Sequence, residues 1–149
     1  MLSRGDIHYH PEFQFEDGTS SKKLLVLLNT PGDQELFLFL KTTSQRKNKP
    51  KVPGCIETYP PLFFLPAKVD FFDQDTWIQL YQIYPIHPID FGKDKRFVKV
   101  GTLKPKTLKT VIDCLLKTQD EDIPNNIKRM LRPKIDESIV KLKKHFMDR

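Results

Sequence analysis

The stretch KLLVLLNTPGDQELFLFL, residues 23–40, contains two apolar runs separated by a short polar segment. The first run, residues 24–28, is continuous, which is typical of a strand buried on both faces. Residues 29–33 read Asn-Thr-Pro-Gly-Asp, which is a strong turn signal. In the second run, residues 36–40, leucine and phenylalanine alternate. The stretch therefore predicts an antiparallel hairpin of two apolar strands.

Further strands are predicted on both sides of this hairpin. Residues 6–15 carry apolar side chains on one parity, interrupted by Pro11, and residues 75–84 alternate throughout. Residues 62–65 are apolar and flanked by prolines, which predicts an edge strand. Short strands separated by turn signals favour a small antiparallel β-barrel over a layered parallel sheet.

After Gly101 the apolar period lengthens to that of a helix. Pro105 suits a first helical turn, and an apolar stripe follows it, formed by Leu108, Val111, Ile112, Leu115 and Leu116. Pro124 and Pro133 each predict the start of another helix. The last helix would present Ile135, Ile139, Leu142 and Phe146. The prediction is thus an α+β fold in a single domain, 1–149, with a barrel core at about 3–103 and helices within 105–149.

Composition narrows the class of protein. With 38% hydrophobic and 30% charged residues, the 149-residue chain is expected to be globular. It has neither an apolar run long enough to span a bilayer nor an apolar signal region near Met1, so we expect no membrane association and a cytoplasmic location. Cys55 and Cys114 lie far apart and form no CxxC pair, which predicts two reduced thiols and no metal site. Phosphate-loop, dinucleotide-binding and metalloprotease motifs do not occur, so no cofactor is expected.

The net charge of +6 is unevenly distributed. Residues 41–68 hold six bases and one acid, and residues 124–149 hold eight bases and three acids, whereas residues 1–40 are net acidic. Two separate basic segments are consistent with a surface that binds a polyanion. Solvated lysines that aid solubility explain the same pattern equally well.

Four short segments occur in a suggestive order: GDI at 5–7, KKLLVL at 22–27, TTS at 42–44 and KVGTL at 99–103. In that order they resemble the MazF/PemK family, whose corresponding segments read GDI, RPVLVI, PLTS and KIGTL. The resemblance runs loosely from about residue 3 to 117, and residues 124–149 extend beyond it. It implies an SH3-like barrel and a ribosome-independent endoribonuclease toxin.

The resemblance also implies a mechanism and partners. Metal-independent cleavage of single-stranded RNA uses the 2′-hydroxyl of the substrate, so the protein supplies proton transfer and a cation for the phosphoryl transition state. In the family an Arg and a Thr or Ser serve these needs. Here Lys22 or Lys23 stands nearest to the arginine position, and Thr43 and Ser44 are retained. An antitoxin protein and a symmetric homodimer are further implied partners.

Candidate RNA-binding residues surround these positions. Arg46, Lys47, Lys49 and Lys51 cluster in one polar segment and would contact phosphates, although a solvated loop is the equal alternative. His8 and His10 share a strand face, so they would serve as an acid–base pair, as RNA contacts or as metal ligands lacking a third partner. An ordinary surface strand is the favoured interpretation of the two histidines. The alternative function is a non-catalytic SH3-like module that binds protein or nucleic acid.

Overall fold

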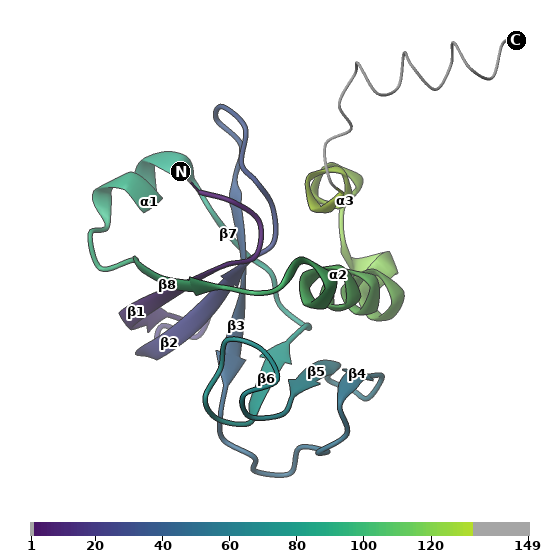
Figure 1. Ribbon diagram of the computed structural model, residues 1–149. Coiled ribbons are helices and arrows are strands. Elements are labelled where there is room, and N and C mark those ends of the chain that lie inside the picture. Colours follow the sequence, from purple (N-terminus) through teal and green to yellow (C-terminus); the bar gives the residue numbers. More distant parts are fainter. Residues whose placement is uncertain (1, 133–149) are drawn as a thin grey trace, which may run out of the picture.

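The computed structural model describes residues 2–132 and shows an α+β fold with a mostly antiparallel sheet (Figure 1). The helical elements are α1 (Pro88–Lys93), α2 (Pro105–Gln119), a 3₁₀ turn (Asp120–Asp122) and α3 (Asn125–Leu131). The strands are β1 (Asp6–Gln14), β2 (Ser20–Leu27), β3 (Phe37–Thr43), β4 (Gly54–Ile56), β5 (Leu62–Leu65), β6 (Thr76–Gln79), β7 (Tyr84–Ile86) and β8 (Val98–Thr102).

The predicted hairpin is confirmed as β2 and β3. The two strands pair antiparallel, with Leu25 opposite Lys41 and Leu27 opposite Phe39. Asn29 closes the turn between them. Its buried side chain donates to the Leu36 carbonyl at 3.0 Å and accepts from the Leu38 amide at 3.1 Å. The turn is therefore held by one side chain that replaces two backbone partners.

Strand β3 is shared by two parts of the sheet. Its residues 37–39 pair with β7, while Thr42 and Thr43 pair with β6. The strand order is β4-β5-β6-β3-β2-β1-β8, with β7 beside β3. Within the described residues, the end strands β4 and β8 do not pair with each other, so hydrogen bonds do not close the sheet into a barrel.

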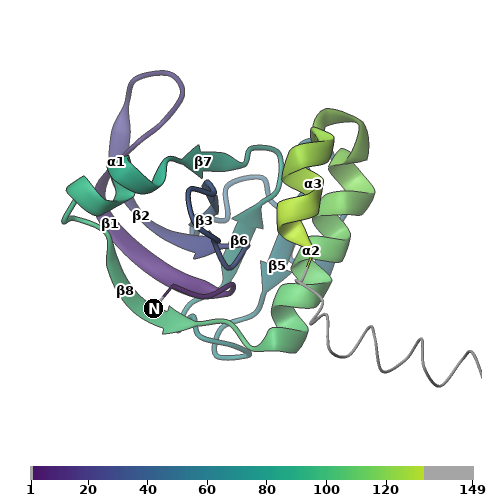
Figure 2. The ribbon, with the colours of Figure 1, turned by 90° about the horizontal axis from the view of Figure 1, so that it is seen from above.

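Apolar side chains lie on both faces of the sheet. One face carries Ile7, Val26 and Leu40 and packs against α2 through Leu108, Val111 and Leu115. The other face carries Leu25, Leu27 and Phe39 and is covered by Phe91 of α1 and by Phe97. Figures 1 and 2 show α1 at one side of the sheet and α2 with α3 at the other. The continuous apolar run of β2 is thus explained by burial on both faces.

Several predicted boundaries need correction. The single strand predicted at 75–84 is two strands, because β6 and β7 pair with different parts of β3 and the chain must turn between them. Strand β5 is not an edge strand, since it lies between β4 and β6. The helices predicted at Pro105 and Pro124 are confirmed. The helix predicted after Pro133, with its apolar stripe, lies outside the described residues.

The prediction of two reduced cysteines is wrong. Cys55 of β4 and Cys114 of α2 form a disulfide, with their Cα atoms 5.6 Å apart. Packing of α2 beside β4 creates this proximity, which is an ordinary spacing for a disulfide. Sequence separation alone does not reveal it, because two cysteines 59 positions apart are brought together only by the folding of the chain between them.

Gly101 allows β8 to approach the rest of the molecule. A Cβ atom added at this position would overlap the ring of Phe71. The glycine of the KVGTL segment is therefore required by close packing. Among the described residues, no helix is both long enough and apolar enough to cross a membrane.

Candidate nucleic-acid interface

Three lysines gather at one end of the β2–β3 hairpin. Lys23 and Lys41 have the same strand parity as Leu25 and Phe39. They therefore lie on the same face of the sheet, beyond the part that α1 covers. The Lys23 ammonium donates to the Thr42 carbonyl at 3.2 Å. Lys49, from the segment after β3, lies close enough to interact electrostatically with Lys23. The sheet therefore concentrates positive charge at this point.

The lysine cluster, Lys23 with Lys41 and Lys49, is electrostatically unfavourable by itself. Burial lowers the pKa of Lys23, and repulsion from Lys41 and Lys49 lowers it further. None of the three ammonium groups forms an ion pair with a carboxylate within residues 2–132. A bound phosphate would relieve this repulsion, because an anion nearby favours the charged form of all three groups.

Aromatic rings surround the Lys41 ammonium. Its nitrogen lies 4.6 Å from the ring centre of Phe15, 5.6 Å from that of Tyr84 and 5.7 Å from that of Tyr81. These distances are within the range of cation–π attraction. The combination of ammonium groups and ring faces is the chemistry with which proteins hold the phosphates and bases of single-stranded nucleic acid.

Glu16 and Tyr84 border the lysine cluster. The Tyr84 hydroxyl donates to a Glu16 carboxylate oxygen at 2.6 Å. This bond lowers the pKa of Glu16, while burial and the same bond raise the pKa of Tyr84. At neutral pH the pair is therefore a carboxylate and a phenol, next to the Lys41 ammonium group.

The four predicted catalytic residues come together only in part. Lys23 belongs to the lysine cluster, and Thr43 lies at the end of β3 close to it. The Thr43 hydroxyl accepts a hydrogen bond from the Gln45 amide at 3.2 Å and keeps its own proton available. Ser44 is exposed on the following segment. Lys22 is exposed, and its parity along β2 directs it away from Lys23.

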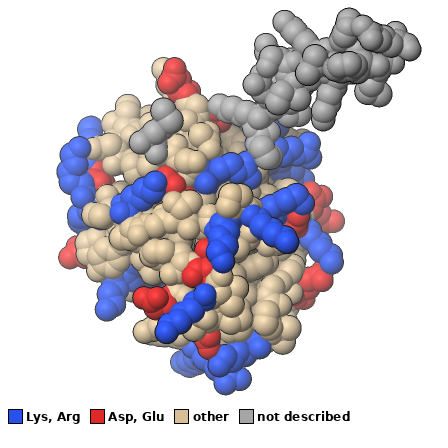
Figure 3. Space-filling model, viewed as in Figure 1, with Lys and Arg blue, Asp and Glu red and all other residues tan. Residues whose placement is uncertain are grey.

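The residues of the predicted basic segment do not all lie at the lysine cluster. Lys49 joins the lysine cluster, whereas Lys51 is neutralised by an ion pair with Asp75 at 2.9 Å. Arg46 and Lys47 are exposed. In Figure 3, basic side chains gather at the lower end of the molecule, where Figure 1 shows the segment between β3 and β4. Elsewhere on that face acidic side chains are interspersed with basic ones.

His8 and His10 are buried, so the surface-strand interpretation is wrong and neither histidine is accessible to RNA on the surface. The 87–97 segment causes this burial, because Phe91 and Phe97 cover the sheet face on which both histidines lie. His8 packs edge-on against Phe39 and Phe91, and His10 against Phe97. No parity signal in the sequence predicts this burial, because Phe13 has the opposite parity and reaches the face of the two histidines only through a β-bulge between His10 and Phe13.

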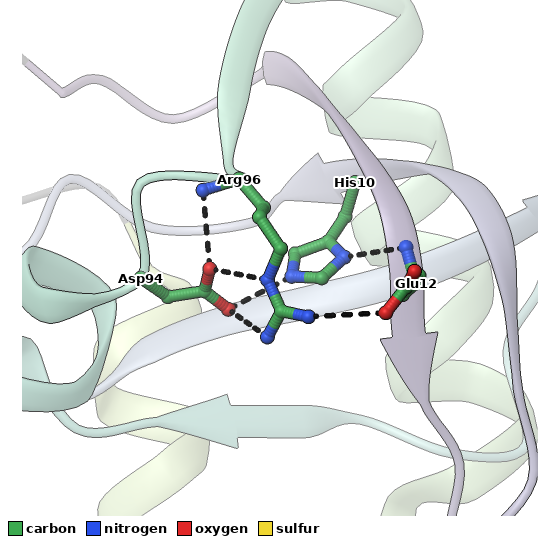
Figure 4. Close-up of polar contacts among 4 residues, drawn as sticks. All are labelled: His10, Glu12, Asp94 and Arg96. Carbon is green, nitrogen blue, oxygen red and sulfur yellow. Dashed lines mark hydrogen bonds and ion pairs between the residues drawn. The ribbon is translucent and has the colours of Figure 1, made fainter.

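His10 belongs to a polar network with Glu12, Asp94 and Arg96 (Figure 4). Its Nδ1 accepts the Glu12 amide at 3.0 Å, so its Nε2 carries the proton that is donated to Asp94 at 2.8 Å. Arg96 binds the same carboxylate through Nε at 2.9 Å and Nη2 at 3.1 Å. These bonds hold the pKa of Asp94 well below its usual range, and the bonds from Arg96 have the largest effect. Both His10 nitrogens are occupied, so His10 positions Asp94 and is not a free base.

His8 predicts a loss of stability on acidification. Burial lowers its pKa below 6.5, with a smaller opposing effect from Asp6 and a smaller lowering from Lys99. The unfolded chain therefore binds this proton more tightly than the folded protein. The contribution of neutral His8 to the free energy of unfolding is fully present above the pKa that His8 has in the unfolded chain. It is lost as the pH falls through the lower pKa that His8 has in the folded protein. Urea unfolding between about pH 7.5 and about pH 5 should show this loss, and it should be smaller in a His8→Phe variant. If the free energy of unfolding falls equally with pH in the wild type and in His8→Phe, His8 is not the cause of the loss.

No group of three or more His, Cys, Asp or Glu side chains that could hold a metal occurs in the described part of the chain. Among known proteins, neither the family models nor the curated proteins include a match to this chain. A function for this chain is therefore inferred from the chemistry of its residues.

Proposed function

We propose that this protein binds single-stranded RNA at the lysine cluster and acts as a MazF/PemK-like toxin, a metal-independent endoribonuclease. The observation that carries the proposal is the convergence of Lys23, Lys41 and Lys49 beside a set of aromatic rings, with no ion pair from these lysines to a carboxylate of residues 2–132. A cytoplasmic location, an antitoxin partner and a homodimer are parts of the same proposal. So is a diverged SH3-like barrel, in which β3 bends from one half of the sheet to the other.

The lysine cluster offers the groups that such cleavage requires. Two ammonium groups, on Lys41 and Lys49, would stabilise negative charge on the phosphoryl oxygens. The 2′-hydroxyl of the RNA would attack the phosphorus and release its proton to solvent water, while Lys23, whose pKa is lowered, is suited to give a proton to the leaving 5′-oxygen. The Thr43 hydroxyl proton would orient a phosphate oxygen. Lysine holds phosphate as a point charge and lacks the bidentate fork of arginine, so we expect slower cleavage than an arginine would support.

The test is incubation of the purified protein with a long single-stranded RNA in the presence of EDTA. We expect discrete fragments with the wild type and none with Lys23→Ala, whereas Lys22→Ala, at the neighbouring exposed position, should leave cleavage intact. Thr43→Ala is expected to slow cleavage. RNA that stays intact at high protein concentration would refute the nuclease proposal, and fragments that depend on Lys22 rather than Lys23 would refute the site.

A second candidate function is the non-catalytic SH3-like module. It is favoured by the positions where some family members use an Arg-x-Asp pair. The positions of this chain that align with the pair are Gln79 and Tyr81. Gln79 donates to the Tyr81 hydroxyl at 2.8 Å, and neither side chain supplies the cation or the carboxylate of such a pair. Binding of RNA without cleavage in the same assay would support this alternative.

A further inference from the structure

A cavity of about 490 Å³ lies next to the lysine cluster. Its wall includes Tyr84, whose ring also faces the Lys41 ammonium at 5.6 Å. Gly18 and Ser20, from the turn that also holds Glu16, line the same side. A nucleotide whose phosphate rests on the lysines would therefore have its base within reach of this cavity.

The cavity presents hydrogen-bond donors as well as acceptors. Arg96 uses three of its five N–H groups on Asp94 and Glu12, which leaves two for a ligand. Asp90, in α1, also lines the cavity, and its carboxylate makes no hydrogen bond or ion pair within residues 2–132. Phe13, Tyr84 and Phe97 supply apolar wall. The lining thus combines one free carboxylate, one partly free guanidinium and aromatic surface.

This combination matches one nucleobase better than the others. Guanine carries two adjacent N–H donors, N1–H and the N2 amino group, that a single carboxylate accepts together. On its other edge O6 and N7 accept from arginine. Adenine, cytosine and uracil have neither this adjacent pair of donors nor the O6 and N7 pair of acceptors. The network of His10 and Asp94 holds the Arg96 guanidinium in place, which reduces the entropy cost of using it.

We infer that this cavity is a base-recognition site for guanine in single-stranded RNA, with Asp90 accepting from the base and Arg96 donating to it. The inference rests on the proposed function, because it requires the adjoining phosphate to lie on the lysine cluster. Arg96 and Asp90 would then determine sequence preference, while Lys23 and Lys41 would determine affinity.

The test is a set of fluorescently labelled RNAs of about seven uridines whose central base is varied, with binding measured by anisotropy. We expect guanine at the centre to bind about tenfold more tightly than the other bases. Asp90→Asn should remove this preference, and any change in its affinity for oligouridine should equal that of Asp73→Asn, which removes the same charge. Asp73→Asn is the matched control, since Asp73 is an exposed carboxylate outside the cavity.

The outcomes separate the inference from the proposed function. Equal binding of all four bases, or a guanine preference that persists in Asp90→Asn, would overturn the inference while RNA binding itself stands. Free guanosine monophosphate that binds as tightly as the guanine-containing RNA would overturn it as well, by making the cavity a mononucleotide site. Failure of every RNA to bind would overturn the proposed function together with the inference.

Discussion

Replacing Lys23 and Lys41 together by glutamine is expected to lower the affinity for single-stranded RNA by more than about tenfold. Glutamine keeps part of the apolar stem and removes the two ammonium groups, which lie over the Phe15 ring. Each phosphate contact to a single strand contributes about 0.7 to the slope of log affinity against log salt concentration. The double variant should therefore lower this slope by about 1.4, as measured by anisotropy across a salt series.

The matched control is Lys106→Gln with Lys109→Gln, which makes the same change in net charge on the exposed side of α2. This pair should leave the salt slope unchanged. If both double variants weaken binding equally, the affinity reflects overall charge and the lysine cluster is not the site.

Reduction of the disulfide between Cys55 and Cys114 is expected to lower the free energy of unfolding by about 4 kcal/mol. This is the chain-entropy value for a closed loop of roughly 60 residues. The disulfide joins β4, the end strand of the sheet, to α2, so its loss should free that end first. Urea unfolding with and without a reductant measures the difference.

A variant with Cys55→Ser and Cys114→Ala provides the control, because it should resemble the reduced protein and show no further response to reductant. Identical unfolding midpoints for the oxidised and reduced wild type would contradict the prediction. Alkylation of free thiols directly in cell lysates would also test the proposed cytoplasmic location. Disulfides are rare in a reducing cytoplasm, so a fully oxidised pair of cysteines would speak against that location.

Local patterns predicted the hairpin and the helices α2 and α3, whereas the short helix α1 was missed. The run at 24–28, the turn at 29–33 and the stripe after Pro105 each depend on neighbours in sequence, so their signals are complete within a short window. The prediction at 75–84 failed because an unbroken alternation does not show that its two halves pair with different parts of β3. Pairing partners are a property of the whole chain.

The difference between local patterns and strand pairing also explains which residues of the candidate site were predicted from the sequence. Lys23, Thr43 and Lys49 were predicted from segments that resemble a known family or are basic. Lys41 was missed, although the register of the hairpin places it opposite Leu25 and on the face of Lys23. Asp90 and Arg96 were beyond prediction, because the covering of the sheet by the 87–97 segment left no local pattern.

Among the described residues, strand β8 pairs only with β1, so its other side is an edge of the sheet. Its exposed Val98 and Val100 are residues that favour addition of a further strand, and Lys99 stands between them. A charged side chain in the middle of such an edge makes stacking of identical molecules unfavourable. At this edge, protection against strand pairing between molecules thus rests on Lys99, which Asp6 holds through an ion pair at 3.4 Å.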